Sequence, residues 1–365
     1  MFLLKAINEN KYFINNLSYL KQYSGFFLLL QGENYKINYY LYNLKDASFR
    51  YKIINQGVFR GIVNDFYIFE NNIEGKEDKK LMTFFKDSTF VKNYEIEGSY
   101  FKQIDNEYFI KETLQGKGNK ITYFNIQNNQ KFWEIESEVR LKYILNVTKE
   151  IFLFSKGYEV VLLKNEHTKF CINLLSYFAP SPQWANGEPM FRQTISKVLY
   201  CQTFNTIICF LKPNKIVGIN SEKGVVVWEQ KFIINTDNFV IDNETGMIYA
   251  LEAVWDNKKD RRTILYQVIN CGNGEIEFER DLYEELNGEI EPFNVHIHFA
   301  GYYEDAIYFS LYERGELYKV SKFSANILEK YKHDKAFYGS PEIFNNRLFV
   351  AEDDEKMKRL LVFEI

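Results

Sequence analysis

The chain has 365 residues, of which 46% are apolar and 18% aromatic, which is enough for a large hydrophobic core. Its 45 basic and 49 acidic residues give a formal net charge of -4, so no global positive field attracts nucleic acid or anionic lipid. Because no run approaches the roughly 18 apolar residues that cross a bilayer, composition disfavours both a nucleic-acid-binding protein and a membrane protein.

The start of the chain and its cysteines indicate the compartment. Met1 to Phe13 lacks the basic segment, apolar stretch and small-residue cleavage site of a secretory signal. The cysteines show no CxxC spacing and are expected to be buried thiols in a reducing compartment. They are Cys171, Cys201, Cys209 and Cys271. We therefore expect a cytoplasmic protein.

Short runs rich in Phe, Tyr, Ile, Val and Leu alternate with turn clusters along the chain. Candidate second strands of repeated units are Gly25 to Leu30, Asp65 to Phe69, Glu107 to Lys111, Glu150 to Phe154, Thr206 to Leu211, Met247 to Leu251, Ala306 to Leu311 and Arg347 to Ala351. Candidate third strands are Tyr39 to Leu44, Leu81 to Phe85, Ile121 to Ile126, Glu159 to Leu163, Lys215 to Ile219, Ile264 to Ile269, Leu317 to Lys322 and Arg359 to Glu364. A spacing of about 40 to 50 residues is typical of four-stranded propeller blades. The sequence therefore predicts an all-β fold, a single β-propeller domain over residues 1–365.

The two ends of the chain indicate how the propeller closes. The third strand of the last repeated unit runs into Ile365, so no residues remain for a fourth strand of that unit. Lys11 to Asn15, by contrast, is a candidate strand that belongs to no unit. Supplying the missing strand from the N-terminus would remove an unpaired edge and two exposed blade faces. We predict eight four-stranded blades, the last closed by an N-terminal strand. Seven blades is the alternative, because the fourth unit departs from the repeat around Cys171 to Leu174.

A turn motif recurs in these units: a short polar residue, three residues later a small or turn-forming pair, and four further on an aromatic. The copies are Asn43, Asp46, Ala47, Tyr51; Asn125, Asn128, Asn129, Trp133; Asn220, Lys223, Gly224, Trp228; and Asn270, Asn273, Gly274, Phe278, with looser copies ending at Tyr94 and Tyr331. We predict that Gly or Asn supplies the positive φ of a tight hairpin, and that the aromatic packs between neighbouring blades.

The copy with Gly218, Asn220, Lys223, Gly224 and Trp228 resembles the tryptophan-docking repeat of the PQQ-type propellers. That family includes quinoprotein dehydrogenases, periplasmic and outer-membrane assembly scaffolds, and other binding propellers. Its dehydrogenases are exported, ligate calcium beside the quinone and carry a vicinal disulfide over the cofactor. This sequence has no adjacent cysteine pair and no export signal. The resemblance therefore implies the fold, and we expect the non-enzymatic branch with no cofactor.

Titratable residues offer few candidates for chemistry. His296 and His298 would share one face of a strand and could bind a metal with Glu291 or Asp305, but polar side chains beside the channel are the simpler interpretation. Other charged stretches are expected to be solvated turns. They are His167, His333, the run Glu352 to Glu355, and the cluster Lys258, Lys259, Arg261 and Arg262. Because no nucleophile motif accompanies them, we predict no catalytic residue and no metal site.

The strongest functional candidate is an inserted loop at about 176–193, which contains three of the six prolines, Pro180, Pro182 and Pro189. Proline stiffens a loop and cannot donate to a sheet ladder, so the segment should project beyond the blades. Its composition is typical of a protein-binding hot spot. The predicted contact residues are Tyr177, Phe178, Trp184, Met190 and Arg192. Alternatively, the loop folds over the channel mouth and buries its own aromatics.

Four functions remain open from sequence. We favour a non-catalytic protein-binding scaffold, of which an inhibitor or immunity-type protein is one version. The alternatives are a ligand- or carbohydrate-binding sensor, a hydrolase or lyase with acidic residues at the channel mouth, and a secreted scaffold that has lost its signal. For the favoured function we expect a protein partner, no nucleic acid, no membrane, and a monomer or a partner-bound complex.

Overall fold

The described part of the chain is almost entirely β-structure. The computed structural model describes residues 2–7, 22–23, 26–33, 36–43, 48–54, 57–63, 66–86, 89–98, 100–104, 107–147, 150–164, 167–178, 183, 194–212, 215–231, 238–256, 260–286, 297–344, 346–352 and 360–365. The helical element within these ranges is a single 3-10 turn, η2 (Leu175–Tyr177). No helix among the described residues is long and apolar enough to span a bilayer. The all-β prediction is confirmed.

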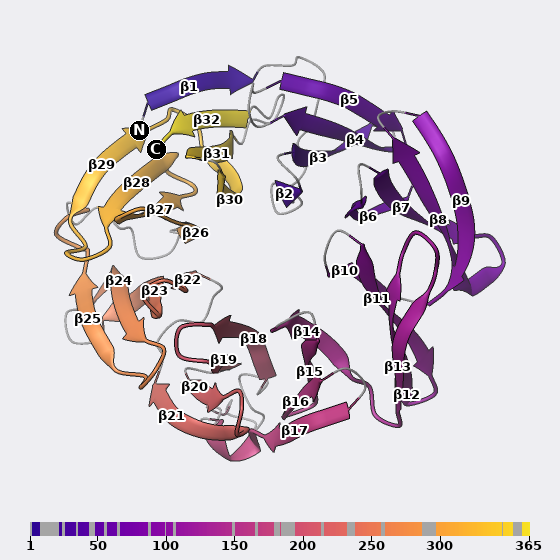
Figure 1. Cartoon of the computed structure of the whole chain (residues 1–365). Helices are drawn as coiled ribbons and strands as arrows, with labels where there is room; N and C mark the ends of the chain where they lie inside the picture. The colour runs from indigo at the N-terminus through magenta and orange to yellow at the C-terminus, as the bar shows by residue number, and fades with distance from the viewer. Residues whose placement is uncertain are drawn as a thin grey trace. The chain divides into compact units, whose positions relative to one another are not determined.

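The chain divides into two compact units. The first unit contains Tyr12–Lys156 and Val160–Cys171, and the second contains Met1–Lys11, Gly157–Glu159 and Ile172–Ile365. The described strands form eight four-stranded sheets, labelled in Figure 1. Successive strands of the chain are neighbours in each sheet except the last, so the topology is a series of antiparallel meanders.

Four sheets lie in the first unit, apart from a few residues of β16 and β17 that belong to the second. Their strands are β2 (Gln22–Tyr23), β3 (Phe26–Glu33), β4 (Lys36–Asn43), β5 (Ser48–Ile54); β6 (Val58–Val63), β7 (Phe66–Ile73), β8 (Lys76–Lys86), β9 (Thr89–Glu97); β10 (Tyr100–Gln103), β11 (Tyr108–Gln115), β12 (Gly118–Asn125), β13 (Lys131–Ser137); and β14 (Lys142–Asn146), β15 (Ile151–Lys156), β16 (Glu159–Lys164), β17 (His167–Asn173). The fourth sheet forms even though its sequence departs from the repeat.

Four sheets lie in the second unit. Their strands are β18 (Thr194–Cys201), β19 (Thr206–Lys212), β20 (Lys215–Asn220), β21 (Val225–Lys231); β22 (Phe239–Asp242), β23 (Met247–Asp256), β24 (Arg261–Asn270), β25 (Ile276–Asp281); β26 (Ile297–Tyr303), β27 (Ala306–Leu311), β28 (Glu316–Ser321), β29 (Ile327–Lys332); and β30 (Phe337–Phe344), β31 (Arg347–Glu352), β32 (Leu360–Glu364), β1 (Phe2–Ile7).

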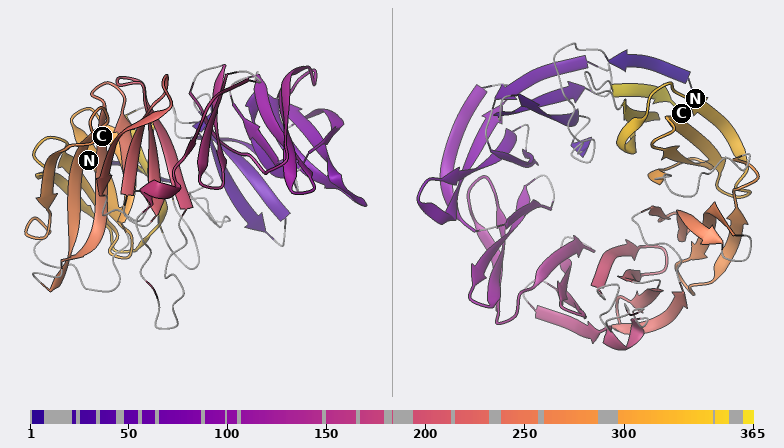
Figure 2. Two further views of the ribbon diagram at one scale, coloured as in Figure 1. Left: turned by 90° about the horizontal axis from the view of Figure 1, so that it is seen from below. Right: turned by 180° about the vertical axis from the view of Figure 1, so that it is seen from behind.

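An N-terminal strand pairs with the last sheet. β1 runs antiparallel to β32, with Leu3 opposite Phe363 and Ala6 opposite Leu361. The two chain ends therefore lie beside each other, as the views in Figure 2 show. The pairing strand is not the predicted Lys11 to Asn15, which lies outside the described residues. Phe2–Ile7 has the higher content of apolar strand-forming residues, which favours it for this role.

Burial follows the position of a strand in its sheet. Second strands such as β19 and β27 are buried at six consecutive residues, whereas the outermost strands β21 and β29 alternate between buried or half-buried and exposed residues. A central strand is covered on both faces by neighbouring sheets, so both sides must be apolar. Within the second unit one shared core joins Tyr249 and Tyr266 to Phe309 and Tyr318 of the next sheet. The sheets therefore pack face to face.

The predicted turn geometry is confirmed. The Asn220 side-chain oxygen accepts the backbone N–H groups of Glu222 and Lys223 at 3.1 and 2.9 Å. Gly224 then adopts a φ of 65° and donates its N–H to the Asn220 carbonyl. The equivalent residues with positive φ are Asn129, Gly274 and Ala325. The short polar residue therefore satisfies the turn backbone, and the left-handed residue lets the next strand begin.

Trp228 packs between sheets as predicted. Only 8% of it is exposed, and its Nε1 donates to the carbonyl of Cys271 in the next sheet at 3.0 Å. A methyl group on Gly218 would collide with the indole, and one on Gly274 would lie 2.5 Å from Cε3. The ring therefore fills a slot between two glycines that belong to neighbouring sheets. This geometry is a physical reason for glycine at position 218 of the copy that contains Trp228 and at position 274 of the next copy.

Other repeat aromatics dock in the same way. The Tyr94 hydroxyl donates to the carbonyl of Ile126, and burial raises the pKa of Tyr94. Trp133 packs edge-on against Phe152 with ring centroids 5.3 Å apart. Tyr331 contacts Phe363 at 4.7 Å. The aromatic positions of the repeat therefore hold consecutive sheets together within each unit; the side chain of Tyr51 lies outside the described residues.

Candidate functional site

The root of the Pro-rich loop is the described part of the predicted contact surface. Leu174 is fully buried, and its N–H donates to the carbonyl of Tyr158 at 2.9 Å. The Asn173 side-chain oxygen accepts the N–H of Leu175 at 2.9 Å, in a turn that leads into η2. Phe178 is 7% exposed and packs edge-on against the Tyr158 ring at 5.4 Å. Two apolar anchors therefore hold the point at which the loop leaves the second unit.

The predicted contact residues fall into three groups. Phe178 is an anchor in this conformation, because its ring is buried. Tyr177 is half-buried beside Leu175, which is 50% exposed. Trp184, Met190 and Arg192 lie outside the described residues. The structure therefore brings Tyr177 and Phe178 together at the root and does not describe the tip.

Buried carboxylates on second strands pair with arginines from neighbouring segments. Glu112 is 6% exposed, and its Oε1 accepts bonds from Arg140 Nε at 2.7 Å and Asn119 Nδ2 at 2.9 Å. Asn119 also bonds both backbone polar groups of Leu141. Arg140 and Leu141 lie on the segment that leads from β13 to the next sheet. Glu70 and Arg60 make a similar pair at 2.6 Å. These acids are structural, because each is held by a cation.

The same arrangement in the second unit corrects two predictions. Glu352, expected in a solvated turn, is 0% exposed, and residues 353–355 lie outside the described residues. His333, also expected to be solvated, stacks on Phe337 and places Nε2 3.2 Å from the Glu352 carboxylate. Lys335 adds a second contact at 3.3 Å. Glu352 ends a strand that is buried on both faces, so its carboxylate needs polar partners there.

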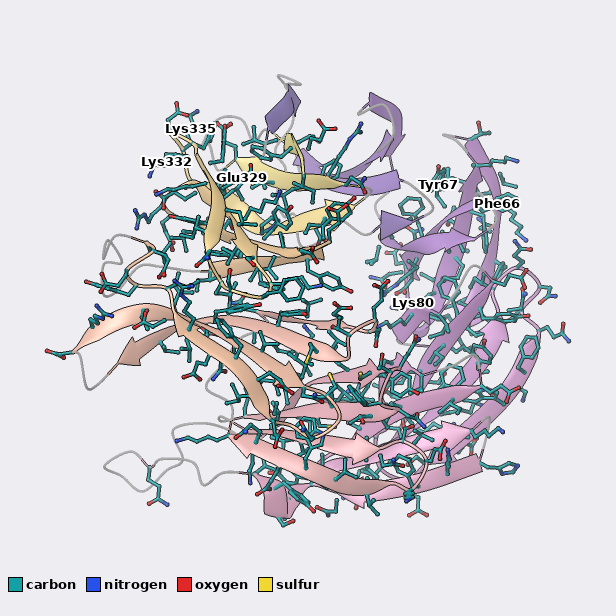
Figure 3. All side chains as sticks on the ribbon, turned by 60° about the vertical axis from the view of Figure 1, so that its left-hand side comes forward. Phe66, Tyr67, Lys80, Glu329, Lys332 and Lys335 are labelled. Atoms are coloured by element: carbon teal, nitrogen blue, oxygen red, sulfur yellow. The ribbon has the colours of Figure 1, made fainter. Side chains whose placement is uncertain are left out.

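Glu316 is another buried carboxylate of the second unit. It is 2% exposed and accepts a hydrogen bond from the Tyr318 hydroxyl at 2.8 Å. Lys330 and Lys332 each lie 3.1 Å from its Oε1; Lys332 and Lys335 are labelled in Figure 3. Burial raises the pKa of Glu316, but these bonds lower it further, so the net pKa lies below the ordinary value. Both lysines lie on β29, so these ion pairs tie β28 to β29.

An ion pair joins two sheets of the second unit. Lys322 Nζ lies 2.9 Å from Asp242 Oδ2, and the two side chains are 6% and 3% exposed. The ammonium also lies over the rings of Tyr249 and Tyr302, at 5.1 and 4.7 Å. The Tyr302 hydroxyl donates to Asp242 at 3.3 Å, and burial raises the pKa of Tyr302 to about 12. The buried charges are therefore fully paired.

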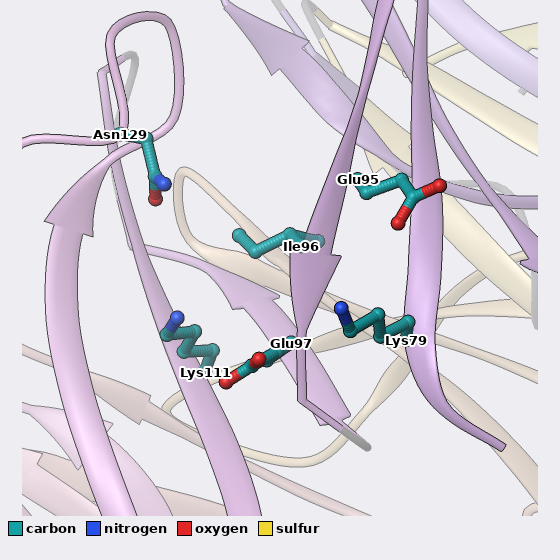
Figure 4. A pocket seen from close by; sticks show the side chains of 6 residues that line it. All are labelled: Lys79, Glu95, Ile96, Glu97, Lys111 and Asn129. Carbon is teal, nitrogen blue, oxygen red and sulfur yellow. The ribbon is translucent and has the colours of Figure 1, made fainter. Parts of the chain in front are cut away.

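A polar pocket of about 270 Å³ lies between the sheets β6–β9 and β10–β13 of the first unit (Figure 4). Its lining residues are Lys79, Glu95, Ile96, Glu97, Lys111 and Asn129. Sequence reasoning missed it, although one signal was present. The second strand β11 has Lys111 where the equivalent strands have Phe69 and Phe154, so a charge interrupts an otherwise apolar position.

A second pocket, of about 310 Å³, lies in the first unit and includes Cys171 with Leu141, Lys156 and Val161. The thiol of Cys171 is exposed, contrary to the prediction that all four cysteines are buried; the other three are buried. Cys171 lies on β17, the outermost strand of its sheet, where alternate residues face solvent. An outer strand is covered on one face only, and the Cys171 thiol is exposed because it lies on the uncovered face.

The histidines give no support for a metal site. His298 packs against the ring of Tyr312 at 5.5 Å, and His296 lies outside the described residues. Among the residues that the structure describes, no three His, Cys, Asp or Glu side chains are grouped to hold a metal ion.

Glu342 on β30 carries a testable pH dependence. Burial raises its pKa from an ordinary 4.5 to about 7. The unfolded chain ionises this group first, so stability should fall as pH rises from about 4.5 to 7. Glu342→Gln should therefore stabilise the protein at pH 8, by at most about 3 kcal/mol, and leave it unchanged at pH 4. Urea unfolding at both pH values measures this. The exposed Glu364→Gln is the control, and equal effects of Glu342→Gln at both pH values would contradict the assignment.

Comparisons with solved structures identify the fold. BamB from Moraxella catarrhalis superposes with a TM-score of 0.59 at 9% identity, over 100% of this chain and 99% of that chain. Sqt1 from Saccharomyces cerevisiae gives 0.58 at 9% identity, over 100% and 98%. A europium-containing methanol dehydrogenase gives 0.57 at 9% identity, over 94% and 90%. These proteins are β-propellers, so the chain has a propeller fold. No protein-family model matches the sequence, and no curated protein matches it.

Proposed function

We propose that this chain is a non-catalytic scaffold that binds a protein through the Pro-rich loop at 176–193. In this proposal the eight sheets are the blades of a single propeller, which the N-terminal strand closes. The pairing of β1 with β32 and the likeness to propellers along the whole chain support this arrangement. The scaffold acts in the cytoplasm, alone or bound to its partner, and an inhibitor or immunity-type protein is one version of it.

The anchored loop root is the observation that carries the proposal. Leu174 and Phe178 fix the backbone on either side of η2, while Leu175 is 50% exposed and Tyr177 is half-buried. A loop that starts from a fixed root and contains three prolines loses less conformational entropy on binding. Tyr, Trp, Met and Arg are the residues enriched where interfaces are buried. The root thus offers a stiff support for Trp184, Met190 and Arg192 beyond it.

Four buried carboxylates support a non-catalytic role. Glu112 and Glu352 are held by cations on the connections between sheets, and Glu316 is held by lysines of the adjacent strand β29. Asp242 is held by Lys322 between two sheets. An acid or base in catalysis must reach a substrate, whereas these side chains are at most 6% exposed. Their positions are explained by stability alone.

The proposal is tested by binding with loop variants. The full chain and its Trp184→Ala, Met190→Ala and Arg192→Ala variants are immobilised and exposed to extract of the native host, and retained proteins are quantified by mass spectrometry. We expect one protein to be retained by the wild type and to bind Trp184→Ala at least about 30-fold less tightly, as for loss of a hot-spot side chain. Leu328→Ala is the control, because Leu328 lies on β29 outside the loop and is 53% exposed. Retention that none of the loop variants reduces would refute the proposal.

A further inference from the structure

Two lysine side chains line the pocket of Figure 4 and have no ion-pair partner among the described residues. Lys79 lies on β8 directly opposite Glu97 of β9, and Lys111 lies on β11 of the neighbouring sheet. In Figure 4 the two lysines lie on either side of Glu97. Both are half-buried. Within the described part of the chain, neither ammonium group is hydrogen-bonded to a side chain or lies within salt-bridge distance of a carboxylate.

The other charges near the pocket are already paired. Glu95, which also lines it, is bound by Lys76 at 3.1 Å. Burial lowers the pKa of Lys111, whereas the charges of Glu97 and Glu134 both act to raise it. Glu134 is held by Lys120 and Lys131, each at 3.4 Å. The lining contains two lysines and two carboxylates, Glu95 and Glu97. With the Lys76 ammonium that pairs with Glu95, the described charges at the pocket sum to one positive charge, and Lys79 and Lys111 make no ion pair among the described residues.

Lys111 is held away from water. Its Nζ lies 5.6 Å from the centre of the Phe124 ring, on the face of β11 where equivalent strands carry phenylalanine. Burial lowers the pKa of Lys111, and the fields of Glu97 and Glu134 only partly oppose this. A partly desolvated ammonium group that lacks a direct counter-ion gains free energy when an anion enters.

We propose that this pocket binds a small organic carboxylate. The carboxylate is held between the ammonium groups of Lys79 and Lys111, and the side-chain amide of Asn129, which also lines the pocket, is the third donor. Ile96 supplies an apolar surface for the ligand's carbon atoms. A volume of about 270 Å³ admits a short organic acid or the last residues of a peptide.

The test uses the full chain with a 13C-methyl label on isoleucine, so that Ile96 reports from inside the pocket. Butyrate and acetyl-Ala-Ala are titrated as a free acid and a peptide end, and butyramide and acetyl-Ala-Ala-amide are their uncharged counterparts. We expect a carboxylate to shift the Ile96 methyl resonance and its amide not to. Whichever carboxylate binds more tightly identifies the source of the ligand.

Variants identify the residues responsible. Lys111→Met and Lys79→Met should each weaken binding at least tenfold, while Lys76→Met, whose lysine pairs with Glu95 outside the lining, should leave affinity within twofold of the wild type. Melting temperatures confirm that each variant is folded. The inference fails if no carboxylate shifts Ile96 at large molar excess, or if Lys76→Met weakens binding as much as Lys111→Met. If Lys79→Met weakened binding and Lys111→Met did not, the assignment of Lys111 to the site would be wrong.

Discussion

Trp228→Ala is expected to lower the free energy of unfolding by about 3 to 5 kcal/mol. The indole fills the slot between Gly218 and Gly274 and contacts the core shared by two sheets of the second unit. Alanine leaves a cavity there, because glycine on both sides has no side chain that can move into the space. The carbonyl of Cys271 also loses its donor, and an unsatisfied buried acceptor adds to the cost.

Urea denaturation followed by circular dichroism measures this loss. Val227→Ala is the matched control, because Val227 is the preceding residue of β21 and is 50% exposed; it should cost less than about 1 kcal/mol. Trp184→Ala in the Pro-rich loop should also leave the melting temperature nearly unchanged. If Trp184→Ala destabilised the protein more than Trp228→Ala, the assignment of core and surface tryptophans would be wrong.

Lys322→Met is expected to cost about 3 to 5 kcal/mol at pH 7, because it leaves the buried carboxylate of Asp242 without its cation. Asp242 is 2% exposed. Its remaining partners are the Tyr302 hydroxyl and the N–H groups of Glu244 and Thr245. These do not neutralise the charge. Methionine keeps most of the apolar stem of lysine, so the loss measures the ion pair and its contacts with Tyr249 and Tyr302.

The pH dependence of stability should differ between the wild type and Lys322→Met. In the wild type, burial raises the pKa of Asp242, but the bonds from Lys322 and the Glu244 N–H lower it further, so the net pKa lies below 3.8. This stabilisation is present above about pH 4 and is lost as pH falls through the folded pKa. In Lys322→Met burial dominates and raises the pKa, so stability should fall as pH rises above about 4. The difference between the two proteins should therefore shrink towards pH 4.

Chemical denaturation at pH 4.5 and pH 7 checks this. Lys319→Met is the control, because Lys319 bonds Glu329 at 3.2 Å in a pair whose side chains are 25% and 39% exposed. A partly exposed pair contributes about 1 kcal/mol or less. A cost of Lys322→Met that is the same at both pH values would show that Asp242 is not left charged and buried.

Much of the fold could be predicted because its signals are local. The spacing from Asn220 to Gly224 to Trp228 is enough to place a turn and a docking aromatic, since the turn bonds lie within five residues. Runs such as Thr206–Lys212 predict a strand covered on both faces because they are apolar without interruption. The pairing of an N-terminal strand with the last sheet also follows from strand order. Strand order did not predict that Phe2–Ile7, and not Lys11 to Asn15, is the strand that pairs.

The candidate site was harder to predict, since its residues come from different sheets. Lys79, Glu97 and Lys111 are separated by up to 32 positions, as their numbers show, and converge only when two sheets pack. The burial of Glu352 and His333 was missed for the same reason. In sequence, Glu352 begins an acidic run that is typical of an exposed turn, but the sheet covers it and His333 and Lys335 hold it.

The amino-acid sequence by itself determined the strands, the repeat and the positions of Asn220, Gly224 and Trp228, because apolar periodicity and turn chemistry act over a few residues. Only the tertiary structure decided which charges are buried and paired and which are left unpaired. Asp242 and Lys322 come from neighbouring sheets, and Arg140 reaches Glu112 from the connection after β13. Lys111 likewise lies beside Glu97 of the neighbouring sheet. The free energy of a charge depends on the neighbours and the solvent around it, and these are set by packing between segments that are distant in the chain.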